Sequence, residues 1–78
     1  MVNWHLYLAR NPAIMGGELI VAGTRVTVST ILDSLAEGAT RAEILASYPT
    51  LLPEHIDAAL AYAADLAREE SLLPLGLL

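Results

Sequence analysis

The amino-acid sequence predicts one small, mainly α-helical domain, in which a short N-terminal β arm and hairpin precede a helix-turn-helix-like core of three helices. The length of 78 residues is that of a single domain. The first third contains β-branched runs interrupted by glycine, and from Ser29 onward the apolar residues follow a helical period. The predicted parts are residues 1–28 for the arm and hairpin, 29–70 for the three-helix core, and 71–78 for an apolar tail.

The N-terminal arm and hairpin are predicted from alternating and β-branched residues. Trp4, Leu6 and Leu8 alternate with other side chains, which is typical of a short strand or of an arm lying across another surface. Farther along, two β-branched runs flank Gly23, and glycine supplies the positive φ that a tight turn requires. We therefore expect a hairpin over residues 18–28.

The first two helices have start and stop signals. Ser29 or Thr30 can cap the first helix, and Gly38 is suited to ending it. Thr40 and Glu43 have the spacing of a capping box, in which each side chain binds the other residue's backbone amide. These signals predict two consecutive helices joined by a short connection.

The third predicted helix, over about residues 53–68, is the longest. Pro49 closes the helix before it, and Pro53 suits its first turn because the missing N–H would be unpaired there anyway. The helical period assigns to the core Ile56, Ala59, Leu60, Ala63, Leu66 and Ala67. It assigns to the outer face Glu54, Asp57, Ala58, Ala61, Asp65, Arg68 and Glu69. We therefore expect an acidic outer face.

The composition favours assembly with another chain and disfavours non-specific binding to nucleic acid. Hydrophobic residues make up 55% of the sequence and charged residues 17%. A chain this short cannot easily bury so much apolar surface in its own core, so we expect a homo-oligomer (dimer or higher) or a protein partner. The net charge is −5, so the chain as a whole does not have the positive electrostatic field that non-specific phosphate binding needs.

The sequence has no features of an exported or membrane-spanning chain. Its start lacks the basic-then-apolar order of a secretion signal, and no apolar run approaches the roughly 18 residues that span a bilayer. Cysteine is absent, which suits a reducing compartment. We expect a cytoplasmic protein without a membrane partner.

The sequence predicts neither an enzyme nor a cofactor or metal site. Its serines lack a nucleophile-elbow context, and no phosphate-binding glycine loop is present. His5 and His55 are too sparse to form a metal site with the nearby carboxylates, so we expect no catalytic residues.

An ordered set of motifs resembles a known bacterial family. The set comprises a glycine pair ending at Gly17, the turn Gly23-Thr24-Arg25, a helix ending at Gly38, the break Tyr48-Pro49, and an alanine-rich final helix with Ala59-Leu60 and Tyr62-Ala63. Over roughly residues 11–66 it resembles the family called domain of unknown function 433. The resemblance implies a homeodomain-like fold of helix-turn-helix type.

The family resemblance also suggests a function. Some relatives are regarded as antitoxins of the VapB type, whose toxins or neighbours have a PIN-like ribonuclease fold. One departure is that Glu18 and Leu19 stand where the family often has lysine and proline, which removes a positive charge from the arm. We expect an antitoxin-like module that pairs with a PIN-like ribonuclease toxin.

Two segments are candidate partner-binding sites. Thr24 and Arg25 lie on the predicted hairpin turn, where Arg25 either pairs with a local carboxylate or contacts a partner. In a ribonuclease partner, Arg25 could neutralise the acidic cluster that holds the metal. The second candidate is the apolar tail, through Leu72, Leu73, Leu75, Leu77 and Leu78.

Two alternative functions remain open. One is a homodimeric DNA-binding transcriptional regulator, with Arg10, Arg25 or Arg41 contacting the nucleic-acid backbone. The acidic outer face expected for the third helix disfavours this reading, because carboxylates repel phosphates. The other alternative is a structural oligomerisation module.

Overall fold

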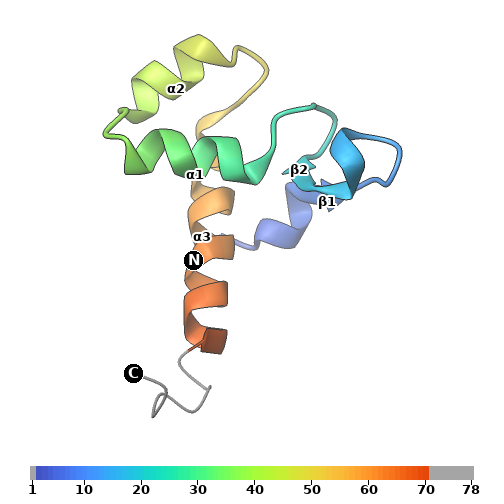
Figure 1. The fold of residues 1–78 in the computed structure, drawn as a ribbon. Coiled ribbons are helices and arrows are strands. Elements are labelled where there is room, and N and C mark those ends of the chain that lie inside the picture. The colour runs from blue at the N-terminus through green and yellow to red at the C-terminus, as the bar shows by residue number, and fades with distance from the viewer. Residues whose placement is uncertain (1, 71–78) are drawn as a thin grey trace.

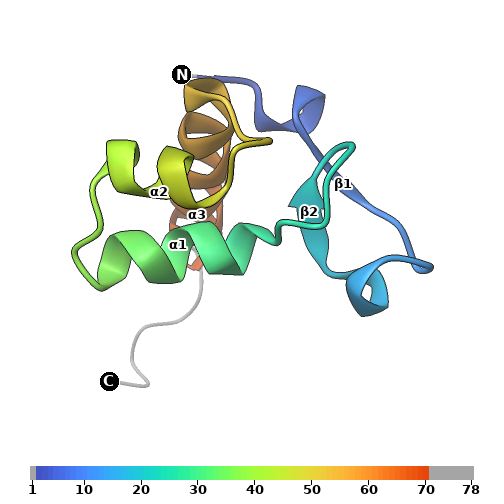
Figure 2. The same ribbon diagram turned by 90° about the horizontal axis from the view of Figure 1, so that it is seen from above.

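The structure, a computed structural model, describes residues 2–70, and it is mainly helical with a two-stranded antiparallel sheet near the N-terminus. Its elements in order are η1 Trp4–Leu6, β1 Leu8–Arg10, η2 Met15–Gly17, β2 Leu19–Val21, α1 Val28–Ala36, α2 Arg41–Ser47 and α3 Pro53–Glu70. Figure 1 shows α1 crossing α3 near one end, while the other half of α3 extends beyond α1, α2 and the sheet. Seen from above, the helices group together and the sheet lies beyond the start of α1 (Figure 2). The predicted fold class is confirmed.

The hairpin pairs different segments from those the sequence predicted. β1 runs antiparallel to β2, with Leu8 opposite Val21. The prediction of a hairpin within residues 18–28 is therefore wrong in its second strand. The chain after β2 adds one isolated bridge, between Ile20 and Thr27, and then enters α1. The side chain of Thr27 caps that helix, so the strand pairing stops there.

Of the two conformations that the sequence allowed around Trp4 and Leu6, a short strand or an arm lying across another surface, the structure has the arm, which forms a 3₁₀ turn. Its conformation follows from a contact with α3. The indole Nε1 of Trp4 donates a hydrogen bond to Asp65 Oδ2 at 2.6 Å. The Trp4 ring also meets the edge of the Tyr62 ring, with centroids 4.9 Å apart. The arm therefore lies along one flank of α3, and Leu6 remains 73% exposed.

The first helix begins earlier than predicted and ends as predicted. Its N-cap is Thr27, in place of Ser29 or Thr30, and Thr27 Oγ1 accepts a hydrogen bond from the backbone N–H of Thr30 at 3.1 Å. Thr27 is also buried, at 5% exposure. Gly38 follows the helix with a φ of 98°, a conformation that glycine adopts without steric cost.

The second helix begins at the capping box that the sequence predicted. The backbone N–H of Thr40 donates to Glu43 Oε1 at 2.8 Å, and the backbone N–H of Glu43 donates to Thr40 Oγ1 at 3.1 Å. The hydrogen bond from the Thr40 backbone first, and one from the Thr40 side chain second, lower the pKa of the Glu43 carboxyl. The capping box is therefore stronger when this carboxyl is ionised.

The third helix begins at Pro53, as predicted, and extends to Glu70, slightly farther than predicted. Its first turn resembles a capping box in which a histidine replaces the usual glutamate. The backbone N–H of Leu52 donates to His55 Nδ1 at 2.9 Å. His55 also meets the Tyr7 ring edge-on, with centroids 6.0 Å apart. His55 therefore has a structural role at the start of α3.

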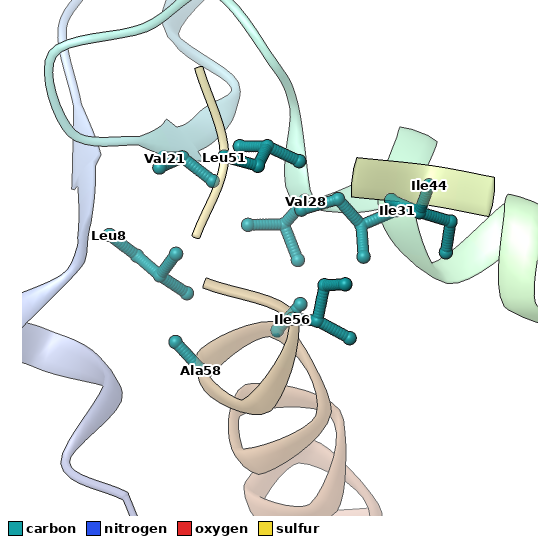
Figure 3. Packing of buried hydrophobic residues seen from close by; sticks show 9 residues of the cluster. Leu8, Val21, Val28, Ile31, Ile44, Leu51, Ile56 and Ala58 are labelled. Atoms are coloured by element: carbon teal, nitrogen blue, oxygen red, sulfur yellow. The ribbon is translucent and has the colours of Figure 1, made fainter. Parts of the chain in front are cut away.

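The core forms where the sheet and the three helices converge. Figure 3 shows side chains from all of these elements and from the loop before α3 pointing into one cluster. The cluster contains Leu8, Val21, Val28, Ile31, Ile44, Leu51, Ile56, Ala58 and Ala59. Ile31 and Ile56 are fully buried, so α1 and α3 hold its centre. The two alanines leave room for close approach of neighbouring elements to α3.

Candidate partner-binding surfaces

The exposed face of α3 differs from the one that the helical period predicted. Ala58 and Ala61, which were expected outside, are 0% and 4% exposed. Leu60 and Leu66, which were expected in the core, are 40% and 42% exposed. The physical reason is the N-terminal arm, which packs along α3 through Trp4 and covers a flank that would otherwise face solvent.

Part of the exposed surface of α3 is a strip with an apolar centre and a charged residue toward each end. We define the α3 strip as Asp57, Leu60, Ala64, Ala67 and Arg68, of which Ala64 is half-buried and the others are exposed. The first four follow a spacing of three, four and three residues, which is that of a coiled-coil seam. A shallow hollow of about 500 Å³ lies beside the strip, lined by Val2, Asp57, Leu60, Ala61 and Ala64. The sequence interpretation missed this surface, although the seam spacing was visible in it.

Two carboxylates of the predicted acidic face are paired within the chain. Asp57 Oδ1 lies 2.7 Å from Arg41 Nη1, an ion pair that joins α3 to the start of α2. Asp65 accepts hydrogen bonds from the Trp4 indole and from Arg68. The Trp4 hydrogen bond, followed by the one from Arg68, lowers the pKa of the Asp65 carboxyl. These pairings reduce the negative field along α3.

The turn after β2 is held by hydrogen bonds and presents Arg25. Gly23 has a φ of 79°, and the backbone N–H of Thr24 donates to Val21 O at 3.0 Å. The Thr24 hydroxyl donates to the same carbonyl at 2.8 Å and accepts from the Val26 N–H at 3.0 Å. Thr24 is half-buried, whereas Arg25 is exposed. Within residues 2–70, the Arg25 side chain makes no hydrogen bond or ion pair.

The structure does not bring the arginines Arg10, Arg25 and Arg41 to one place. Arg10 lies at the end of β1 opposite Leu19, and its Nη1 donates to Gly17 O at 3.2 Å. Arg25 follows the C-terminal end of β2. Arg41 is the first residue of α2, and it forms the ion pair with Asp57 of α3. The strand pairing therefore places Arg10 and Arg25 at opposite ends of the two-stranded sheet. The predicted tail contacts, Leu72 to Leu78, lie outside the described residues.

Neither a metal cluster nor a membrane-spanning helix is found in the part of the chain that the structure describes. No three His, Cys, Asp or Glu side chains among residues 2–70 come together in a group that could hold a metal ion. Over the same residues, every helix is too short or too polar to cross a bilayer.

Comparison with known proteins agrees with the motif pattern of the sequence. The family model described as "Protein of unknown function (DUF433)" matches residues 9–63. The crystal structure of a family member from Anabaena variabilis is similar, with 31% sequence identity and a TM-score of 0.72. The match covers 80% of this chain and 61% of the Anabaena chain. No curated protein matches the sequence significantly. The chain belongs to the DUF433 family.

Proposed function

We propose that this chain is an antitoxin-like protein-binding module that pairs with a PIN-like ribonuclease in the cytoplasm and restrains it. Its three-helix core would be of the homeodomain-like, helix-turn-helix type, used as a scaffold. The observation that carries the proposal is Arg25, an exposed arginine on a hydrogen-bonded turn, whose guanidinium makes no ion pair within residues 2–70.

The chemistry of Arg25 suits an acidic partner site. A guanidinium binds carboxylates through two parallel hydrogen bonds, which gives both affinity and orientation. Because Gly23 and Thr24 fix the backbone of the turn, less conformational entropy is lost when Arg25 is held in a complex. A metal-dependent ribonuclease must gather carboxylates around its metal, and an inserted arginine would neutralise that cluster. Arg25 is therefore the proposed anchor, with Thr24 holding the turn that presents it.

The test is inhibition of the PIN-like ribonuclease that the proposal places in the neighbouring reading frame. Purified ribonuclease would cleave a fluorescent RNA oligonucleotide, and the wild-type chain, added in excess, should suppress the cleavage. Arg25→Ala should weaken inhibition at least about tenfold, because anchor arginines at interfaces contribute more than about 1.4 kcal/mol.

Arg10→Ala is the matched control, since Arg10 is also an exposed arginine of the sheet region and carries the same charge. It should inhibit like the wild type. Equal inhibition by Arg25→Ala and wild type would contradict the role of Arg25. A neighbouring reading frame without the spaced carboxylates of a metal-dependent ribonuclease would contradict the pairing itself.

The tail contributes to the proposal through its composition. Leu72, Leu73, Leu75, Leu77 and Leu78 form an uncharged segment suited to an apolar groove on a partner. Truncation after Ser71 should then lower the affinity for the ribonuclease. Unchanged affinity in a binding titration would remove the tail from the interface.

The alternative function, a homodimeric DNA-binding regulator, has less support. The net charge is −5 and the described arginines are dispersed over the molecule. Phosphate binding weakens steeply as salt rises, so a gel shift over a salt series separates the two functions. We expect no shift at low salt, and a shift that disappears as salt increases would favour the regulator.

A further inference from the structure

We propose that the α3 strip binds a second copy of this chain, through an antiparallel pairing of two α3 helices about a two-fold axis. The inference goes beyond the proposed function, because Arg25 and the tail lie outside the strip. It rests on the exposure of the strip, on its seam spacing, and on the distribution of its charges.

The strip is complementary in shape to itself. In an antiparallel pair of seams, Leu60 of one chain faces Ala64 of the other, and Asp57 faces Ala67. Leu60 is 40% exposed and lies beside a hollow of about 500 Å³, so a bulky side chain from each copy meets a small residue of the other. Alternation of large and small residues is the arrangement that packs helices closely.

The strip is also complementary in charge. Antiparallel pairing brings Asp57, at one end, next to Arg68 of the second copy, and the two-fold axis repeats this contact at the other end. Within one chain these two positions are roughly 16 Å apart along the helix axis, so neither can bind the other. Asp57 also pairs with Arg41, and Arg68 with Asp65, which orients both side chains at the edges of the strip.

A second copy accounts for these features better than an unrelated partner does. A two-fold interface requires one surface to match itself, with opposite charges placed symmetrically about an apolar centre. The strip meets this requirement through Asp57 and Arg68 on either side of Leu60 and Ala64. Because the strip is short, the dimer should dissociate on dilution.

Sedimentation equilibrium of the full-length chain over a concentration series tests the interface. The wild type should move from the mass of one chain toward that of two as concentration rises. Leu60→Glu should remain at the mass of one chain. Leu66→Glu is the matched control, since Leu66 is 42% exposed on the same helix but lies outside the strip, and it should dimerise like the wild type.

A charge exchange then tests the antiparallel register. Asp57→Arg and Arg68→Asp should each dimerise at least tenfold more weakly alone, because each homodimer would place like charges together. An equimolar mixture of the two variants should dimerise again, because the mixed pair restores both opposite-charge contacts. Circular dichroism of each variant checks that its helices are intact.

Each outcome decides the proposal. A wild type that keeps the mass of one chain at every concentration would overturn the interface. Equal loss of dimer in the Leu66→Glu control would also overturn it, by assigning the contact to another face. A mixture that dimerises no better than its components would overturn the antiparallel register. Ribonuclease inhibition by the monomeric Leu60→Glu chain separates this proposal from the antitoxin function.

Discussion

The two halves of α3 have similar alanine-rich sequences but very different surroundings. In the first half, Ile56, Ala58 and Ala59 are fully buried, because the sheet and the other helices surround the helix there. In the second half, Leu66 is 42% exposed, and the N-terminal arm covers one flank. The comparison teaches that burial along α3 depends on which distant segments reach it, and not on helical period alone.

The largest predicted effect is in the buried half of α3. Ile56→Ala should lower the free energy of unfolding by about 3 kcal/mol, because it opens a cavity at a fully buried position. Leu66→Ala, in the other half, should cost less than about 1 kcal/mol, since much of that side chain already contacts water. Urea denaturation followed by circular dichroism measures both. Equal losses would contradict the difference between the halves.

A smaller loss of stability is expected from a substitution at Thr27, which lies between the sheet and α1. Thr27→Ala should cost about 1.5 kcal/mol, because it removes the N-cap and leaves the Thr30 amide without that acceptor. Ser29→Ala should change stability by less than about 0.5 kcal/mol, as expected for an exposed position. A larger loss from the Ser29 substitution would favour the cap position that the sequence predicted.

The exposed half of α3 should lose protection when the arm is weakened. Trp4→Phe removes the indole hydrogen bond to Asp65 while keeping an aromatic ring near Tyr62. Hydrogen exchange should then quicken at the amides of residues 62–68 and stay unchanged near Ile56. Uniform acceleration along α3 would show that the arm stabilises the whole helix equally.

The smallest predicted effect is a pH dependence of the hydrogen bond between the Trp4 indole and Asp65. The pKa of Asp65 is lowered from its ordinary value of 3.8, first by the Trp4 hydrogen bond and then by Arg68. The stabilisation is therefore present above that ordinary pKa and is lost as pH falls through the lowered one. Fluorescence of Trp4, the single tryptophan, should report this loss below pH 3.8.

Asp65→Asn is the control for the titration. An amide in place of the carboxyl has no charge to lose, so the fluorescence of this variant should lack the acid transition assigned to Asp65. Identical acid transitions in the variant and the wild type would assign the change to another group.

The parts of the fold that sequence reasoning found are those fixed by local chemistry. The capping box of Thr40 and Glu43, the stop at Gly38 and the start at Pro53 depend on residues a few positions apart. Such signals act within one turn of chain, so the sequence displays them directly. The order of the three α-helices within residues 2–70 was therefore predicted correctly.

The parts that sequence reasoning missed depend on contacts between distant segments. The pairing of β1 with β2 and the contact of Trp4 with Asp65 join residues whose separation no local pattern reveals. The error in the exposed face of α3 followed from the second contact. Of the candidate site, the turn that carries Arg25 was visible in the sequence, whereas the strip around Leu60 required knowledge of the arm.

Single-cysteine labelling tests most directly whether α3 exposes the α3 strip at Leu60 and buries the neighbouring position Ala61. The chain has no cysteine, so one thiol placed at Leu60 or at Ala61 reports the exposure of that position alone. At concentrations too low for dimers, Leu60→Cys should react with a thiol reagent at nearly the rate of an unfolded peptide. Ala61→Cys should react at least about tenfold more slowly, because reaction requires local opening. Faster labelling of Ala61→Cys than of Leu60→Cys would contradict the account and restore the acidic face predicted from the helical period.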